Sequence, residues 1–379
     1  MFIYHIGLFG EELSKKVSKY TRSEINHEGG NSMNKRVIGL LIAVISAATA
    51  SCSPMDHSEG AQIGSAVNGP RKIGFLVYNS GDAYLSQAQN AFAGVAGYKA
   101  TVNFKDSQNS QQIQNKNIDD YIDKKFDALV VNPVDRTATS IIIDKAKRAG
   151  VPVVFFNREP LPDDMKKWNR IYYVGAKAEQ SGAMAGEIMA DYFKRHPDAD
   201  KNKDGTMQYV MLKGQPGHQD AEIRTKYAVK AVEDAGIKVE KLAEDTAGWD
   251  RNKGRDKMAA FLSTYGDRIE AVFSNNDEMA LGAIEALKRR GYFKENKYIP
   301  VVGVDATPDA IKALEEGTLL GTVLNDAKNQ GRALFNLALA LANKQTPTKE
   351  NIGGYELTDG KYVWTAYKKI TKDNLYDTR

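Results

Sequence analysis

The sequence predicts an α/β protein made of two doubly wound parallel-sheet lobes that are joined by a hinge. Three observations lead to this fold class. From Lys72 onward, short runs rich in β-branched residues alternate with amphipathic helices, the pattern of parallel sheets that are covered on both faces. These strand–helix units are too many for one compact sheet, so two lobes are the natural division. Polar residues also gather where several predicted strands end.

The predicted strands are short apolar runs, and most of them precede a helical pattern. They are IGFLVY (73–78), DALVVN (127–132), PVVFFN (152–157), QYVMLKG (208–214), AVFSNN (271–276), IPVVGVD (299–305) and GTVLN (321–325). The helical patterns include ATSIIIDKAKRAG, AEQSGAMAGEIMADYF, MALGAIEALKRRG and QGRALFNLALALANK, and several end at a glycine stop signal. We expect an N-terminal lobe of residues 72–176 plus 321–358 and a C-terminal lobe of residues 177–320 plus 359–379.

Composition and charge indicate a soluble globular protein that does not bind nucleic acid. The chain has 379 residues, of which 42% are hydrophobic and 26% charged, so it can build a large core without covalent help. The formal net charge is only +4, and no basic stripe of the kind that contacts nucleic acid is evident.

The N-terminal part is typical of a bacterial export signal. Lys35 and Arg36 precede a mostly apolar stretch, residues 37–48, that is too short to span a bilayer. Small residues then lead into Cys52, the one cysteine of the chain. This pattern resembles a lipoprotein signal in which Cys52 becomes the lipidated N-terminus, although Thr49 stands where such signals have a large aliphatic residue. The small residues at 48 and 50 also fit ordinary cleavage, which gives a free periplasmic protein.

Both alternatives export the protein. Residues 1–32 are polar and unlike the start of a signal, so we expect Met33 to be the true start and residues 1–52 to hold the upstream segment and the signal. Residues 53–71 are rich in serine, glycine and polar residues, and we expect them to form a flexible linker.

Polar residues at strand ends predict a binding site between the lobes. Asn157, Asp305 and Asn325 each end a predicted strand, and Asn275, Asn276 and Asp277 follow another. Ligands of parallel sheets bind beyond the carboxyl ends of the strands. Capping of the helices that follow accounts for about half of these residues, and the rest indicate a ligand.

Two further segments carry suitable chemistry. In GHQDAEIR, Asp220 and Arg224 are four residues apart on the opening turn of a helix, after His218. Arg224 can orient Asp220 and still donate to a ligand, whereas the alternative is a surface ion pair. Trp249 lies among polar residues in DTAGWD, and Tyr84 follows the first strand. Their rings suit the two faces of a pyranose, although a tryptophan at this place can also fill a gap between lobes.

The run DKNKDGTMQ, residues 200–208, resembles the first nine positions of a calcium loop. Oxygen side chains alternate at Asp200, Asn202, Asp204 and Gln208, with Gly205 at the turn. Met211 stands where the loop would place its closing carboxylate, so that ligand must come from elsewhere. A solvated turn between a helix and a strand is the alternative.

Taken together, the segments DSQN, VVFFNREP, DKNKDG, LKGQPGHQDAEIR, DTAGWD, IEAVFSNND, GVDATPDA and GTVLNDAKNQ resemble the family of bacterial periplasmic D-galactose/D-glucose-binding proteins. These are the substrate-binding components of sugar ABC transporters and have the type I periplasmic binding protein fold. The resemblance runs over about residues 72–374. It implies that the sugar contacts Asp82, Tyr84, Asn157, His218, Asp220, Arg224, Trp249, Asn276, Asp305 and Asn325. It also implies a structural Ca²⁺ held by Asp200, Asn202, Asp204, the carbonyl of Thr206, Gln208 and Glu270.

The resemblance implies binding without catalysis by a monomer in the periplasm. The sugar would be D-galactose or D-glucose, with Asp82 accepting either epimer at carbon 4, and the closed protein would be read by an ABC transporter permease and by a chemoreceptor. The sequence differs from the family at Tyr84, where phenylalanine is usual, at Gln219, where proline is usual and the turn is looser, and at Cys52, because the best-known members carry no lipid anchor. A hydroxyl at Tyr84 either changes specificity or points to solvent.

Three alternatives stay open at this point. A binding protein for another monosaccharide, a pentose or a modified hexose, is the nearest. A sugar-responsive transcription regulator shares the fold but needs an N-terminal helix-turn-helix where this chain has an export signal. A hydrolase could pair carboxylates among Asp82, Asp220 and Asp305, although an enclosing cleft leaves little room for water and a leaving group.

Overall fold

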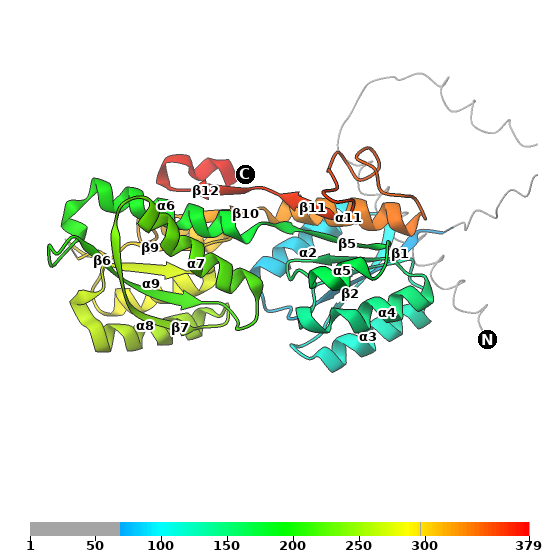
Figure 1. The fold of residues 1–379 in the computed structure, drawn as a ribbon, viewed down its shortest axis with the longest axis horizontal. Helices are drawn as coiled ribbons and strands as arrows, with labels where there is room; N and C mark the ends of the chain where they lie inside the picture. The colour runs from blue at the N-terminus through cyan, green and yellow to red at the C-terminus, as the bar shows by residue number, and fades with distance from the viewer. Residues whose placement is uncertain (1–68, 296, 379) are drawn as a thin grey trace, which may run out of the picture. The chain divides into compact units, whose positions relative to one another are not determined.

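The computed structural model describes residues 69–295 and 297–378, and its elements form two lobes of the expected α/β class (Figure 1). Residues 53–68, most of the expected linker, and the expected export signal lie outside the described residues.

The N-terminal lobe contains a six-stranded sheet in the order β11-β5-β4-β3-β1-β2, with every neighbouring pair parallel. Its strands are β1 (Arg71–Val77), β2 (Ala100–Asp106), β3 (Ala128–Val131), β4 (Val153–Phe156), β5 (Ile171–Ala176) and β11 (Tyr362–Thr365). The helices α2 (Ala83–Ala96) and α11 (Ala327–Ala342) pack on one face. The helices α3 (Gln111–Asp123), α4 (Thr139–Ala149) and α5 (Pro162–Lys166) pack on the other, after the short 3-10 helix η1 (Arg136–Ala138).

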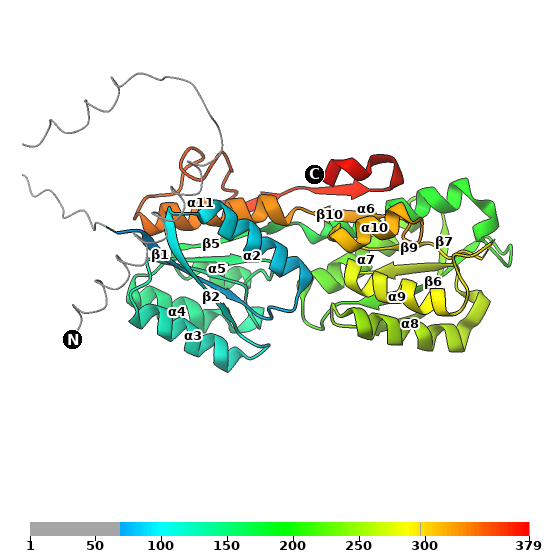
Figure 2. The same ribbon diagram turned by 180° about the vertical axis from the view of Figure 1, so that it is seen from behind.

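The C-terminal lobe contains a parallel four-stranded sheet in the order β7-β6-β8-β9. Its strands are β6 (Thr206–Lys213), β7 (Lys238–Thr246), β8 (Ala271–Ser274) and β9 (Val301–Val302). The helices α6 (Ala178–Arg195) and α7 (Gln219–Asp234) cover one face. The helices α8 (Arg251–Tyr265), α9 (Asp277–Arg289) and α10 (Pro308–Glu315) cover the other (Figure 2). The 3-10 helices η2 (Pro197–Ala199), η3 (Gly266–Arg268) and η4 (Lys372–Thr378) complete the lobe.

Two short strands extend this second sheet and correct the expected lobe boundaries. β10 (Thr322–Asn325) is joined to the β9 side by parallel bridges, and β12 (Tyr367–Ile370) pairs antiparallel with β10. Residues 321–325 therefore lie in the C-terminal lobe, and β11, which pairs with β5, places residues 362–365 in the N-terminal lobe. Both differ from the expected division, because apolar periodicity identifies a strand but not the sheet that accepts it.

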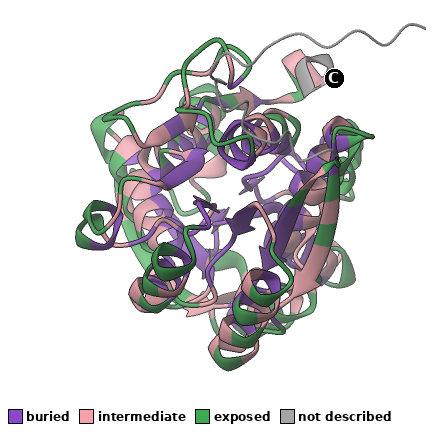
Figure 3. Ribbon diagram, turned by 90° about the vertical axis from the view of Figure 1, so that its right-hand side faces the viewer, coloured by how far each residue is buried: buried purple, intermediate pink, exposed green. Residues whose placement is uncertain are grey.

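The chain passes between the lobes three times, each time at a single residue between two elements. Lys177 separates β5 from α6, Asp326 separates β10 from α11, and residue 366 separates β11 from β12. These three segments are the hinge. The buried segments lie in the strands and on the inner sides of the helices, whereas exposed residues lie on the outer sides (Figure 3). Each sheet has an apolar cluster on both faces, so the carboxyl-end loops are held by rigid layers.

Candidate functional site

The structure brings all of the residues expected to contact the sugar to one cavity with walls from both lobes. The lining residues are Asp82, Tyr84, Asn157, His218, Asp220, Arg224, Trp249, Asn276, Asp305 and Asn325. They lie at or after the carboxyl ends of β1, β4, β6, β7, β8, β9 and β10, as expected for parallel sheets. Their roles toward a ligand stay a prediction.

Asp82 is fixed as the N-cap of α2. Its Oδ1 accepts from the backbone N–H of Leu85 at 3.0 Å, and its Oδ2 accepts from the hydroxyl of Tyr78 at 2.9 Å. Each carboxylate oxygen keeps a lone pair for a further donor. Capping and ligand binding are therefore compatible in one side chain, and the same holds for Asn276, the N-cap of α9.

Asn157 follows β4 in a left-handed conformation, with φ 59°, which asparagine tolerates better than most residues. Its Oδ1 accepts from Nδ2 of Asn132 at 3.0 Å. Its backbone oxygen accepts from the hydroxyl of Tyr173 at 3.0 Å. The side-chain oxygen is thus occupied, so Asn157 offers its Nδ2 as a donor.

His218 is the N-cap of α7, and its protonation is set by that position. Nδ1 accepts from the backbone N–H of Asp220 at 3.1 Å. Burial, together with the nearby Arg158 and Arg224, holds the pKa of His218 well below its usual value. The ring is therefore neutral with its proton on Nε2, and it offers one donor.

Asp220 and Arg224 form a buried ion pair rather than the surface pair that was the alternative. Nη2 of Arg224 lies 3.0 Å from Oδ2 of Asp220, and the two side chains are only 5% and 9% exposed. Burial raises the pKa of Asp220, while Arg224 opposes that shift.

The guanidinium of Arg224 also donates to three other groups: Oγ of Ser181 at 3.2 Å, the backbone oxygen of Asn275 at 2.9 Å and the hydroxyl of Tyr367 at 3.1 Å. The head group is thereby fixed before any ligand arrives. Ser181 and Tyr367 are positioning residues that the sequence did not single out, because they lie on α6 and β12, far along the chain.

Trp249 is held at the edge of the cavity by its backbone and by a close neighbour. Its backbone is left-handed, with φ 71°, and its carbonyl oxygen accepts from Nδ2 of Asn276 at 3.3 Å. Its ring meets that of His218 edge-on, with centroids 5.0 Å apart. A Cβ at Gly214 would lie 2.1 Å from the indole, so glycine is required there for the ring to occupy this place.

A chain of hydrogen bonds connects Tyr84 to Asp305 along the hinge side of the cavity. The Tyr84 hydroxyl donates to Oε1 of Gln330 at 2.5 Å, and Nε2 of Gln330 donates to Oδ1 of Asn325 at 2.7 Å. Nδ2 of Asn325 then donates to Oδ1 of Asp305 at 3.3 Å. The Tyr84 hydroxyl therefore does not point to solvent. Gln330, in α11, had no signal in the sequence beyond its place in a helical pattern.

Asp305 and Asp277 are buried carboxyl groups with different surroundings. Burial raises the pKa of Asp305 well above its usual value, and Arg224 opposes this. Asp277 lies outside the cavity, where Oδ1 accepts from the Thr322 hydroxyl at 2.6 Å and Oδ2 from the Thr307 backbone N–H at 2.8 Å. Burial raises the pKa of Asp277 to about 7. It ties the start of α9 to β10 and to the N-cap of α10.

The cavity thus combines acceptors, donors and aromatic rings. Asp82, Asp220 and Asp305 accept, and Arg224 and His218 donate together with the amides of Asn157 and Asn276. This set can hold a small neutral molecule that is rich in hydroxyl groups, since each hydroxyl both donates and accepts.

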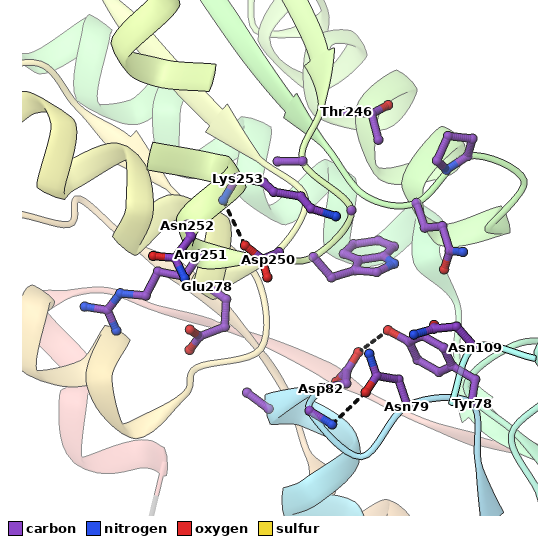
Figure 4. A pocket seen from close by; sticks show the side chains of 17 residues that line it. Tyr78, Asn79, Asp82, Asn109, Thr246, Asp250, Arg251, Asn252, Lys253 and Glu278 are labelled. Atoms are coloured by element: carbon purple, nitrogen blue, oxygen red, sulfur yellow. Dashed lines mark hydrogen bonds between the residues drawn. The ribbon is translucent and has the colours of Figure 1, made fainter. Parts of the chain in front are cut away.

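A second, wider pocket adjoins the cavity between the lobes. Its volume is about 510 Å³, and it shares Asp82 and Trp249 with the inner cavity. Figure 4 shows Tyr78 and Asp82 on one side of this pocket and Asp250, with the residues that follow it, on the other. The two spaces together form the cleft between the lobes.

The expected calcium loop is a tight turn before β6. The backbone N–H of Asp204 donates to Oδ1 of Asp200 at 3.2 Å and to Oδ1 of Asn202 at 3.0 Å. The N–H of Gly205, with φ 76°, donates to Oδ2 of Asp200 at 2.9 Å. These bonds hold the oxygen side chains on the inside of the turn.

Glu270 reaches this loop from the residue before β8. Its Oε1 accepts from the Lys201 N–H at 2.6 Å and its Oε2 from the Gln208 N–H at 3.0 Å. Oε1 of Gln208 is buried without a partner, while its Nε2 donates to Oδ2 of Asp204 at 2.9 Å. Rotating that amide would bring the orphaned oxygen to the Asp204 side, which suits a cation.

Among the described residues, no group of three or more His, Cys, Asp or Glu side chains lies close enough together to hold a metal ion. The carboxylates of the expected calcium set therefore do not converge by themselves. The fit to Ca²⁺ depends on the mixture of carboxylate, amide and carbonyl oxygens in the loop and on the unpaired oxygen of Gln208.

The expected lipidation residue, Cys52, lies outside the described residues. Within the range that the structure describes, no helix is both long and apolar enough to cross a membrane.

Comparisons with known proteins find related sequences and structures. The model of the periplasmic binding protein domain matches residues 73–346. Over 311 residues the chain is 42% identical to the D-galactose/methyl-galactoside binding periplasmic protein MglB of Haemophilus influenzae, which covers 81% of this chain and 91% of that protein. It is 31% identical over 289 residues to a ribose import binding protein of Salmonella typhimurium, which covers 76% of this chain and 86% of that protein.

Solved structures show the same fold. An ABC transporter solute binding protein from Bacillus halodurans with bound myo-inositol has a TM-score of 0.69 and 29% sequence identity. The match covers 83% of this chain and 98% of that one.

Proposed function

Because the chain belongs to the periplasmic binding protein domain family, we propose that it binds a monosaccharide between its lobes and delivers it to an ABC transporter permease. D-galactose or D-glucose is the proposed ligand. The observation that carries the proposal is the convergence of all ten expected side chains on one cavity. The similarity to a D-galactose/methyl-galactoside binding protein supports the choice of sugar.

The mechanism is binding without a chemical step. The carboxylates of Asp82, Asp220 and Asp305 accept sugar hydroxyls, and Arg224, His218 and the amides donate to them. Trp249 and Tyr84 cover the two faces of the ring. A sugar that lacks or inverts a hydroxyl leaves a buried polar group unpaired, and it is rejected for that reason.

Closure couples binding to transport. Both lobes supply ligand contacts, so the sugar stabilises the closed arrangement relative to the open one. We propose that the permease, and a chemoreceptor where one is present, recognises the closed form. Incubation with galactosides and glucosides should yield no product, because the protein acts as a binder.

Calorimetry with a sugar panel tests the proposed ligand. We expect one-to-one binding of D-galactose or D-glucose and much weaker heats with D-ribose and myo-inositol, the ligands named for more distant relatives. Binding of a pentose or an inositol in preference to both hexoses would instead support the alternative of another monosaccharide. No heat with any of them would count against the function itself.

We further propose that the loop of residues 200–208 and Glu270 bind a structural Ca²⁺. The unpaired Oε1 of Gln208 and the oxygen-rich turn support this. In this site Asp200, Asn202 and Asp204 would supply oxygens, with Gln208, the Thr206 carbonyl and Glu270. A bound ion would tie the loop to the start of β8.

For localisation, we propose export to the periplasm with lipid on Cys52. Mass spectrometry of the native N-terminus distinguishes a diacylated Cys52 from a free N-terminus after cleavage at an earlier residue. A monomer in gel filtration is expected in either case.

A further inference from the structure

Apart from the hinge, the two lobes meet at a small polar junction beside the cavity. It consists of Asn157 and Arg158, which follow β4, and of Gln215 and Gln219, which follow β6. Nη2 of Arg158 donates to Oε1 of Gln215 at 2.6 Å, and Nε2 of Gln219 donates to the backbone oxygen of Asn157 at 3.0 Å. Both bonds run from one lobe to the other.

Arg158 is prepared for this contact by its own lobe. Its side chain is buried, 4% exposed, and its guanidinium carbon lies 3.7 Å from the ring centroid of Tyr78. Nη1 donates to the carbonyl oxygen of Val134. Stacking and this bond hold the head group at the lobe surface, so opening the cleft breaks the bond to Gln215 without releasing Arg158 from its lobe.

Gln219 acts on a residue of the cavity. Asn157 lines the cavity, and its carbonyl oxygen accepts from Gln219 across the cleft and from Tyr173 within its own lobe. Gln219 is the first residue of α7, and His218 before it caps the helix. The turn before α7 is therefore held by the cap, and the side chain of Gln219 is available for the bond between the lobes.

The junction is not fully paired. Nε of Arg158 and Oε1 of Gln219 are buried, and neither has a hydrogen-bond partner among the described residues. Opening the cleft would admit water to both atoms, which opposes closure. The junction therefore favours closure only moderately, and its strength depends on individual side chains.

We propose that Arg158, Gln215 and Gln219 form an interlobe latch that stabilises the closed arrangement independently of the ligand and positions Asn157 from the opposite lobe. Only the effect of the latch on sugar binding rests on the proposed function; its effect on lobe closure does not. Part of the closure is then preformed, so the latch slows release of the sugar. Neither Gln215 nor Gln219 touches the sugar in this account, and each acts through Arg158 or Asn157.

The test compares Gln219→Met and Gln215→Met with Gln87→Met, a control on α2 whose amide, among the described residues, bonds only within its helix. Methionine keeps the length of the side chain and removes its hydrogen bond. Gln219→Pro is a second variant, because proline is tolerated at the first position of a helix. Lobe closure is followed by energy transfer between dyes on Tyr98→Cys and Lys312→Cys, exposed positions on different lobes, in a Cys52→Ser background.

Without sugar, the wild type should show a larger high-transfer population than either junction variant, and Gln87→Met should match the wild type. With saturating D-galactose, all variants should reach the same high-transfer state. The sugar dissociation rate should rise roughly 2- to 10-fold for each single variant, while the melting temperature without sugar stays close to that of the wild type.

Identical transfer distributions without sugar, together with unchanged dissociation rates, would overturn the latch. A fall in melting temperature with no change in closure would show a merely structural contact and would also overturn it. If the wild type binds no sugar but the junction variants still open, the proposed function fails and the latch stands.

Discussion

Tyr84→Phe removes one oxygen atom from the hydrogen-bond chain beside the cavity and tests how much that chain contributes to stability and to sugar affinity. The hydroxyl of Tyr84 is the donor to Oε1 of Gln330, a side chain that is only 2% exposed. Without it, that oxygen is buried and unpaired. Turning the Gln330 amide over would not help, because its oxygen would then face Oδ1 of Asn325. Turning the Asn325 amide in response would bring the oxygen of Asn325 to the carboxylate of Asp305.

The cost can be bounded from this geometry. A buried acceptor that loses its only donor costs about 1–3 kcal/mol of folding free energy. For a domain of this size that corresponds to a fall in melting temperature of roughly 2–10 °C. Sugar affinity should fall as well, since Gln330, which orients Asn325 and through it Asp305, loses the hydroxyl that holds its own amide in place.

Thermal unfolding followed by circular dichroism, without and with D-galactose, measures both effects. Tyr172→Phe is the matched control, because that tyrosine is also buried but its hydroxyl has no hydrogen-bond partner among the described residues. If Tyr84→Phe melts at the same temperature as the wild type and Tyr172→Phe, the hydrogen bond from Tyr84 to Gln330 does not stabilise the fold as argued.

Three other predictions concern the aromatic wall, the calcium loop and a buried carboxyl group. Trp249→Ala should leave the fold intact and weaken sugar binding at least about 30-fold; wild-type affinity in calorimetry would rule out a stacking role. Chelation should lower the melting temperature, and Glu270→Gln should reproduce much of that loss, so an unchanged melting curve would refute the metal. The pKa of Asp277, about 7 in the folded protein against 3.8 when unfolded, means that the native state holds the proton more tightly. The free energy of unfolding should therefore fall by at most about 4 kcal/mol as pH rises from about 4 to about 7, and Asp277→Asn should remove that part of the slope; equal slopes in urea titrations would contradict this.

The buried central strands and nine of the ten cavity residues were accessible from the sequence because each has a local signal, whereas Asp82 was implied only by the family resemblance. Buried parallel strands are continuous apolar runs, and polar residues at their carboxyl ends are conspicuous. The edge strands β2 and β7 carry a weaker signal: β7 reads KVEKLAEDT and has no buried residue, as is usual for a sheet edge that is protected by charge. No local signal shows that β10 belongs to the C-terminal lobe and β11 to the N-terminal lobe.

The supporting residues of the cavity were not accessible in the same way. Gln330, Ser181 and Tyr367 bond to cavity residues from helices and strands far along the chain, and only the packing of α11, α6 and β12 places them there. Gly214 ended a predicted strand, but its role beneath Trp249 depends on the packing of the indole, which would lie only 2.1 Å from a Cβ at this position. The surface alternative for Asp220 and Arg224 was excluded by burial, which the spacing of two residues does not determine.

A crystal structure of the protein grown with D-galactose would show whether the cleft between the lobes encloses the sugar. We expect one sugar enclosed between the lobes, with its hydroxyls on Asp82, Asp220, Arg224 and Asp305 and its ring against Trp249. A sugar bound elsewhere on the surface, or a cleft that stays empty at saturating D-galactose and D-glucose, would contradict it.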